Sequence, residues 1–341
     1  MLICRCCLLL ILVGEWCVIS VDSHSNIMEY RKIISDAWAL TQNSKRLIIW
    51  FGFIPAIFTT IVAVGMILYQ YIAFKNSPFF GAQEGIYRDI FIFIWDYITG
   101  HTNIIIPIII VGIFFAIFYL LYPILAKATA IQIIARKRNG QSLSLGDGLK
   151  YAFGTFLPLL QYKLLVATFS VLTIVNEVSV VVRNFGPGTL TFMLPLFGLI
   201  LIAGLVMTLL FTYAEFFIVI DREDVFTSIR KSTRLVIYNW KHTFLVTLLM
   251  LLIGLRIVIQ ALVVFLLPAV ILFISGYIAT LFSIVPAVIV GVILGLIVLI
   301  MTAYLNGIVD VFSYSVWTFT FLELTEQEEV AARSKVESKE A

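Results

Sequence analysis

Six long apolar runs constrain what this chain can fold into more than any other feature of its sequence. A helix needs about 20 apolar residues to cross the hydrocarbon core of a bilayer. The runs cover residues 47–74, 104–126, 164–182, 190–220, 243–273 and 285–319. They are continuous and lack the ten-residue alternation of membrane β-barrels. We therefore predict an all-α polytopic membrane protein with six transmembrane helices.

Composition excludes several other classes of protein. Hydrophobic residues make up 61% of the 341 residues and charged residues 13%, whereas soluble domains have roughly 45–50% and about 25%. This excludes a soluble globular domain, a nucleic-acid binder and a disordered chain. All four cysteines lie near one end, so neither a disulfide framework nor a metal site is expected; they are Cys4, Cys6, Cys7 and Cys17. We expect no metal and no cofactor.

Lysine and arginine are distributed unevenly among the loops. Eighteen of the 23 basic residues lie before the first run, after the second and fourth runs, or in the C-terminal tail. The opposite side carries Lys75, Arg88 and Arg183. Because cytoplasmic loops are enriched in basic residues, we predict that both termini of the six-span core (residues 28–320) are cytoplasmic. Residues 321–341 are then a polar cytoplasmic tail, either a solvated helix or disordered.

Residues 1–27 do not fit the six-span pattern. Arg5 followed by apolar residues 8–13 is similar to a short signal peptide, but cleavage there would invert every later loop against the distribution of basic residues. Three interpretations stay open: a short seventh span, an interfacial segment, or an upstream extension of a chain that begins functionally at Met28. We favour the extension.

Each odd-numbered run follows a basic segment with apolar residues at helical spacing. The three stripes are Tyr30, Ile33, Ile34, Ala37, Trp38 and Thr41; Leu145, Leu149, Ala152, Phe153, Phe156 and Leu160; and Phe226, Ile229, Thr233, Val236, Ile237 and Trp240. Such helices lie in the membrane interface, with basic residues toward anionic headgroups. The alternative is a helix packed under the bundle as ordinary core, and one helix can do both.

These segments predict an internal repeat and a set of lipid contacts. The chain is interpreted as three copies of an interfacial helix followed by two spans, over residues 29–135, 143–220 and 221–320. The expected partners are the lipid bilayer and its anionic headgroups. The candidate headgroup contacts are Arg31, Lys32, Lys150, Arg230, Lys231 and Arg234. The Asn-Gly pair ending at Gly140 and the sequence FGPG at residues 185–188 predict turns.

Residues 216–244 combine an apolar run, an acidic turn and an amphipathic helix that ends in Asn-Trp, reading FFIVIDREDVFTSIRKSTRLVIYNWKHTF. Together with residues 128–162, this pattern resembles the membrane domain of bacterial membrane-anchored glycerophosphodiester phosphodiesterases and related multi-span bacterial proteins. The resemblance implies a six-helix domain of the bacterial plasma (inner) membrane. In that family the chemistry belongs to a separate soluble barrel, so no phosphodiesterase activity is expected from the residues present.

Ionisable residues inside a membrane are costly and define candidate sites. Glu177 and Arg256 each lie about 13 residues into their spans, or about 20 Å deep, and Gln260 is one turn from Arg256. They form either a polar site for a substrate or ion, or a structural pair between two helices. A second candidate, near the cytoplasmic ends of the even spans, is an inner polar cluster that lines a cavity or snorkels to the interface; its members are Lys127, Glu215, Asn306 and Asp310.

Two further patterns are structural. Ala287, Gly291 and Gly295 recur at four-residue spacing, which predicts a close helix–helix approach in the sixth span. The partner helix is either internal, which we favour, or from another subunit. Hydroxyl groups within the third span are expected to bond to backbone carbonyls or neighbouring helices rather than act as nucleophiles; they belong to Thr168, Ser170 and Thr173.

No catalytic motif occurs in the sequence. We therefore predict a non-enzymatic membrane scaffold or accessory domain that engages lipid headgroups or partner proteins. The alternative is a transporter or lipid-translocating protein with a polar site at Glu177 and Arg256.

Overall fold

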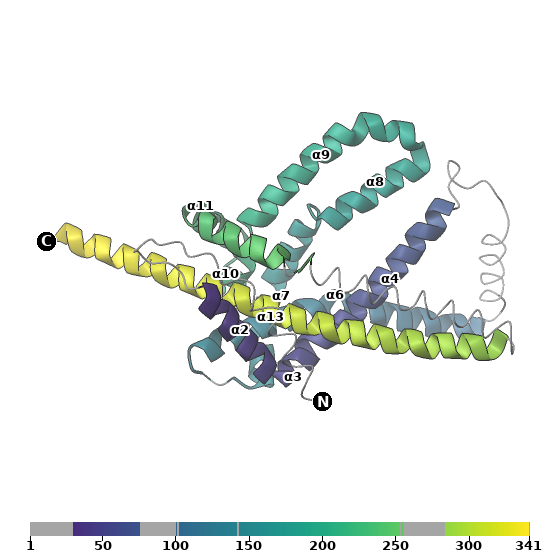
Figure 1. Cartoon of the computed structure of the whole chain (residues 1–341), viewed down its shortest axis with the longest axis horizontal. Coiled ribbons are helices and arrows are strands. Elements are labelled where there is room, and N and C mark those ends of the chain that lie inside the picture. Colours follow the sequence, from purple (N-terminus) through teal and green to yellow (C-terminus); the bar gives the residue numbers. More distant parts are fainter. Residues whose placement is uncertain are drawn as a thin grey trace. The chain divides into compact units, whose positions relative to one another are not determined.

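The computed structural model of the protein describes residues 30–75, 100, 102–141, 143–252, 254–255 and 284–340. These residues are helical apart from short turns, and no strand occurs among them. The elements are α2 (Tyr30–Asn43), α3 (Lys45–Leu47), the π-helix η1 (Ile48–Phe53), α4 (Ile54–Lys75), α6 (Thr102–Arg138), α7 (Leu145–Ala167), α8 (Val171–Phe185), α9 (Pro187–Leu210), α10 (Ala214–Ile220), α11 (Val225–Tyr238) and α13 (Ile284–Glu340) (Figure 1). The prediction of an all-α protein is confirmed.

Four helical stretches in the described part of the chain are long and apolar enough to cross a membrane. They are Lys45–Ile67, Ile109–Arg138, Pro187–Ile220 and Ile293–Val330. A fifth is added if Val225–Tyr238 and Trp240–Leu252, which meet at 97°, form one bent span. The predicted fifth run lies largely outside the described residues, as does the cysteine-bearing segment 1–27. The count of six spans and the three repeats stay predictions.

The predicted third span, residues 164–182, is not one helix. α7 continues to Ala167, and α8 begins only after a break where the Ser170 hydroxyl accepts a hydrogen bond from the Thr173 N–H at 3.2 Å. Thr168 and Thr173 donate their hydroxyls to backbone carbonyls, as expected, whereas Ser170 caps a helix. α8 has 15 residues and rises about 22 Å, which is less than the roughly 30 Å of a hydrocarbon core.

Both predicted turns are confirmed. Gly140 has a φ of +74° in the turn that follows α6, and Gly186 has a φ of +86° between α8 and α9. Residues other than glycine rarely adopt this left-handed backbone conformation. The Gly186 turn makes α8 and α9 the two arms of a hairpin, visible in teal in Figure 1.

The two longest helices, α6 and α13, each have an exposed apolar stretch followed by a buried one. On α6, Ile106 and Leu120 are more than half exposed, whereas Ile131 and Ile134 are fully buried. α13 changes in the same way, and its 57 residues carry the predicted sixth span into the predicted polar tail. Exposed apolar faces of this extent indicate contact with lipid. We call the buried portion, formed by residues 124–135, 213–219 and 311–324 with α7 and α11, the helical base.

η1 and α13 approach each other closely at two glycines. A Cβ atom added to Gly52 would overlap the Gly307 carbonyl oxygen, and one added to Gly307 would lie 2.5 Å from the Phe53 nitrogen. Only glycine allows two backbones to come this near. In contrast, a Cβ at Gly295 would meet nothing within 4 Å among the described residues. The close contact among the described residues is therefore at Gly307, and the approach predicted at Ala287, Gly291 and Gly295 stays a prediction.

A proline explains the π-helix that carries Gly52. The Ile54 N–H bonds to Ile49 O, five residues back, and Pro55 has no N–H to offer. The Trp50 carbonyl consequently receives no backbone N–H from the residue four positions on, Ile54, or from the residue five positions on, Pro55. The Tyr122 hydroxyl donates to it instead, at 2.5 Å. Tyr122 lies on α6, so this bond also ties α6 to η1.

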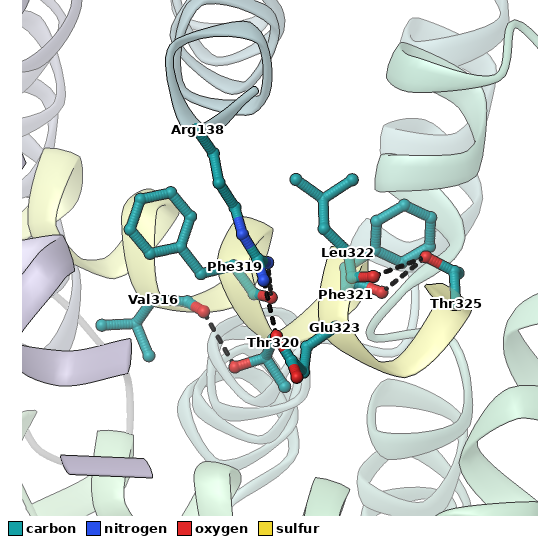
Figure 2. Close-up of polar contacts among 8 residues, drawn as sticks. All are labelled: Arg138, Val316, Phe319, Thr320, Phe321, Leu322, Glu323 and Thr325. Atoms are coloured by element: carbon teal, nitrogen blue, oxygen red, sulfur yellow. Dashed lines mark hydrogen bonds and ion pairs between the residues drawn. The ribbon is translucent and has the colours of Figure 1, made fainter. Parts of the chain in front are cut away.

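Arg138, at the end of α6, connects this helix to α13 through a hydrogen bond and an ion pair (Figure 2). Its guanidinium donates to Phe319 O at 2.6 Å and pairs with the Glu323 carboxylate at 2.5 Å. The same guanidinium lies 5.5 Å from the Phe319 ring centroid. Arginine can satisfy a carbonyl and a carboxylate together because its donors are held in one plane.

The glycine contact makes a testable prediction. Gly307→Ala should lower the free energy of unfolding by about 2 kcal/mol, because overpacking a close contact typically costs about 1–3 kcal/mol. Gly295→Ala is the matched control in the same helix and should be neutral or stabilising by up to about 1 kcal/mol. Unfolding of the purified protein in detergent measures both. Equal destabilisation by the two changes would contradict the assignment of the contact to Gly307.

Candidate functional site

Five ionisable side chains meet where the helical base joins the exposed apolar halves. Lys127 comes from α6, Lys163 from the end of α7, Glu215 from the start of α10, and Asp310 and Tyr314 from α13. We call this set the inner charged cluster. It contains three of the four residues predicted for the inner polar cluster, and the fourth, Asn306, lies one turn before Asp310 on α13.

The Glu215 carboxylate bridges two ammonium groups. Its Oε1 lies 2.6 Å from Lys127 Nζ and its Oε2 lies 3.8 Å from Lys163 Nζ. The Glu215 and Lys127 side chains are 13% and 17% exposed, and that of Lys163 is 40% exposed. A pair this buried is stable only when both charges are present, since a single remaining charge would be desolvated without compensation.

A break in the fourth span positions Glu215. α9 ends at Leu210 and α10 starts at Ala214, which leaves backbone groups near the break to be satisfied. The Ser232 hydroxyl donates to Leu210 O at 2.7 Å and accepts from the Tyr213 N–H at 3.1 Å. The Tyr162 hydroxyl donates to Phe211 O at 2.8 Å. These bonds from α11 and α7 stabilise the break and with it the position of the carboxylate.

Neighbouring charges change the proton affinity of Lys163. The nearby Lys127 ammonium, and then partial burial, lower the pKa of Lys163 from 10.5 to about 8, although Glu215 opposes the shift. Lys127 also lies 5.2 Å from the centre of the Tyr314 ring, a favourable cation–π arrangement. The cluster therefore holds two cations and two carboxylates beside a tyrosine, a set suited to structural pairing or to carrying a proton.

The predicted site around Glu177 is only partly described. Glu177 is an exposed residue of α8, while Arg256 and Gln260 lie outside the described residues. Beside it, Gln70 on α4 donates its amide to Asn176 Oδ1 at 2.6 Å. This inter-helix bond between polar side chains joins α4 to α8 one residue before Glu177.

The predicted headgroup contacts differ in their surroundings. Arg31, Lys32 and Arg230 are exposed. Lys231 pairs with Glu223 at 2.5 Å, Arg234 with Glu328 at 3.7 Å, and Lys150 with Asp147 at 3.9 Å. The last three charges are thus partly neutralised within the chain.

α11 has one face buried against the helical base and another face exposed. Ser228, Ser232 and Leu235 are buried in the helical base, whereas Phe226 is 80% exposed and Ile237 is 60% exposed. The predicted apolar stripe of α11 is therefore exposed at Phe226 and Ile237 but buried at Val236, and the face toward the base combines the two serines with Leu235 and Val236.

α7 divides in the same way, with Ala152, Thr155 and Leu159 buried and Phe153 and Leu157 exposed. In α2 the predicted stripe is buried at Ile33, Ala37 and Thr41.

Two members of the inner charged cluster were not identified as site residues from the sequence. Lys163 was counted with the cytoplasmic loop because it precedes an apolar run, and Tyr314 was one of many aromatic residues in the sixth span. The available signal was spacing, since Tyr314 follows Asp310 by one helical turn. Within the described residues, no group of three or more His, Cys, Asp or Glu side chains could hold a metal ion.

No known protein family, curated protein or solved structure matches the chain. The similarity to the membrane domain of glycerophosphodiester phosphodiesterases stays a prediction from the sequence.

Glu215→Gln tests the role of the bridging carboxylate. It should lower the free energy of unfolding by about 3 kcal/mol, because Lys127 is left buried without a counter-charge. The double variant Lys127→Met/Glu215→Gln should recover most of this loss. Glu329→Gln, which breaks an exposed pair with Arg333, is the control and should change stability by less than about 1 kcal/mol. A fully stable Glu215→Gln protein would refute the structural role.

Proposed function

We propose that this protein is a non-enzymatic membrane domain that binds anionic lipid headgroups through basic amphipathic helices and serves as a scaffold for partner proteins. In this proposal it resides in a bacterial plasma membrane, with both ends of the core in the cytoplasm. The observation that carries the proposal is the 97° bend between Val225–Tyr238 and Trp240–Leu252. An amphipathic helix set at a right angle to an apolar helix lies in the membrane plane when the apolar helix crosses it.

The side chains of α11, together with Trp240 and Lys241 just after its end, support this interpretation. The exposed apolar residues Phe226, Ile237 and Trp240 provide a surface for acyl chains. Arg230 and Lys241 are exposed basic residues that can reach anionic headgroups. Aromatic and basic side chains of this kind are enriched at the boundary between lipid and water. The serine face of α11, held by the helical base, fixes the helix in this orientation.

Fluorescence quenching by brominated lipids tests the position of α11. In vesicles of the full-length protein, the difference between wild type and Trp240→Phe reports on Trp240 alone. Quenching should be strong when bromine sits near the headgroup end of the acyl chain and weak when it sits near the bilayer centre. Quenching that is strongest at the bilayer centre, or absent at every depth, would contradict an in-plane α11.

The lipid preference has its own test. Brominated phosphatidylglycerol should quench Trp240 more than brominated phosphatidylcholine at equal mole fraction. Arg230→Gln/Lys241→Gln should reduce this preference, because each basic residue near an anionic surface contributes about 1 kcal/mol. Arg333→Gln, a comparable charge loss on the tail, should leave it unchanged. The same preference in all three proteins would count against headgroup binding by α11.

An alternative proposal is a transporter or lipid-translocating protein with a polar intramembrane site around Glu177 and Arg256. The Gln70–Asn176 bond beside Glu177 favours it, since polar groups within membrane helices often mark paths for ions or substrates. In proteoliposomes containing a pH-sensitive dye, an imposed membrane potential should drive protons faster than in empty vesicles. Glu177→Gln should abolish the difference, and Ser179→Ala should retain it. Identical rates in wild-type and empty vesicles would exclude proton transport.

A further inference from the structure

A basic groove lies between the end of α2 and the turn that joins α6 to α7. It has a volume of about 850 Å³. Its polar lining includes Asn43, Ser44, Lys45, Arg46, Lys137 and Gln141, and its apolar lining includes Leu47 and Ile133. The groove therefore combines cations and amide donors with an apolar wall.

Three cations converge on this groove without a counter-charge from the described part of the chain. The described residues that line it include no carboxylate. Among all the described residues, no carboxylate lies within 4.0 Å of the charged nitrogens of Lys45, Arg46 or Lys137. By contrast, Lys127 and Arg138 on the same α6 helix are both paired. Unpaired cations at one place attract an external anion.

The geometry of Lys137 makes the groove more specific than a loose basic patch. Lys137 Nζ lies 2.9 Å from Ser44 Oγ, so the end of α6 is joined to the start of the first membrane helix across the groove. The ammonium keeps further donors for a ligand, because lysine has three. Gly140, with its φ of +74°, turns the chain back so that Gln141 lines the same groove.

The position of the groove along the helices indicates the level at which it meets the membrane. The candidate span Lys45–Ile67 begins at the groove and the candidate span Ile109–Arg138 ends at it. Ile49 and Trp50, one turn after the groove cations, are 45% and 52% exposed. The groove thus lies where apolar span surface gives way to basic residues, which is the level of lipid phosphates.

We propose that Lys45, Arg46 and Lys137 form a binding site for a phosphate group, carried by an anionic lipid headgroup or by a small soluble phosphate ester. Arginine and lysine supply charge-assisted hydrogen bonds to phosphate oxygens, and Asn43 and Gln141 can add neutral donors. Binding of a lipid headgroup, unlike binding of a soluble ester, rests on the proposed function, because it needs a bilayer beside the groove. The groove residues are nevertheless separate from those of α11.

Lipid binding is tested with the full-length protein in phosphatidylcholine nanodiscs that contain phosphatidic acid, whose headgroup is a phosphate monoester. Native mass spectrometry measures the lipid retained. Each of Lys45→Gln, Arg46→Gln and Lys137→Gln should weaken retention about fivefold, and the triple variant more than about tenfold. Lys137→Arg keeps the charge and should retain the lipid. Arg333→Gln, at an exposed arginine of the tail outside the groove, is the matched control.

Soluble phosphate is tested separately, by calorimetry with glycerol 3-phosphate and inorganic phosphate in nanodiscs of phosphatidylcholine alone. Binding to wild type that is lost in the triple variant supports the soluble ligand, and retention of phosphatidic acid alone supports the lipid. Equal behaviour of wild type and triple variant toward all three probes overturns the site, as does an equal loss in Arg333→Gln.

Trp240 quenching in the folded triple variant separates this inference from the proposed function. The triple variant should keep the wild-type quenching profile, because its substitutions are remote in sequence from α11. If Trp240 is not quenched in wild type but the groove still binds phosphate, only the proposed function fails. If quenching is normal and the groove binds none of the probes, only this inference fails.

Discussion

The backbone contact between Gly52 and Gly307 determines how the helical base is assembled. It brings α13 against η1 at a distance that any Cβ atom would prevent. Asp310 follows Gly307 by one turn and Tyr314 by two, so the same contact carries both toward Lys127 on α6. The π-helix that holds Gly52 arises from Pro55, and the bond from Tyr122 to Trp50 then adds α6 to the contact. A proline and two glycines thereby bring together three segments that are far apart in the sequence.

The charged residues lie where burial and exposure to lipid meet. Lys127 on α6 and Asp310 on α13 lie where the exposed apolar part of each helix meets its buried part. Glu215 lies at the corresponding point after α9, at the start of the buried helix α10. An isolated charge there would cost several kcal/mol, and the bridge from Glu215 to Lys127 and Lys163 offsets much of that cost. The break between α9 and α10 belongs to the same arrangement, because bonds from Ser232 and Tyr162 stabilise the turn that presents Glu215.

The sequence was informative where one physical preference dominates. Four of the six long apolar runs coincide with helices that are long and apolar enough to cross a membrane, and positive φ at Gly140 and Gly186 agrees with the turns predicted there. Prediction was weaker where tertiary contacts decide. The third run is apolar on both sides of Thr168–Ser170, and these three residues lower its mean hydropathy too little to reveal that the helix ends there. Ser228 and Ser232 are buried because they face the helical base, whereas a hydrophobic stripe alone assigns the contact to larger residues such as Phe226.

The distribution of ion pairs also changes how the basic residues are interpreted. The sequence alone does not distinguish Lys150, Lys231 and Arg234 from Arg230 as cations able to bind lipid headgroups. In the structure each of the first three faces a carboxylate of the chain, which weakens its attraction for headgroups. Lys45, Arg46 and Lys137 have no such carboxylate partner among the described residues. Because unpaired charge retains the strongest attraction for an external anion, the arrangement of acidic residues, more than the number of basic ones, determines where this protein attracts phosphate.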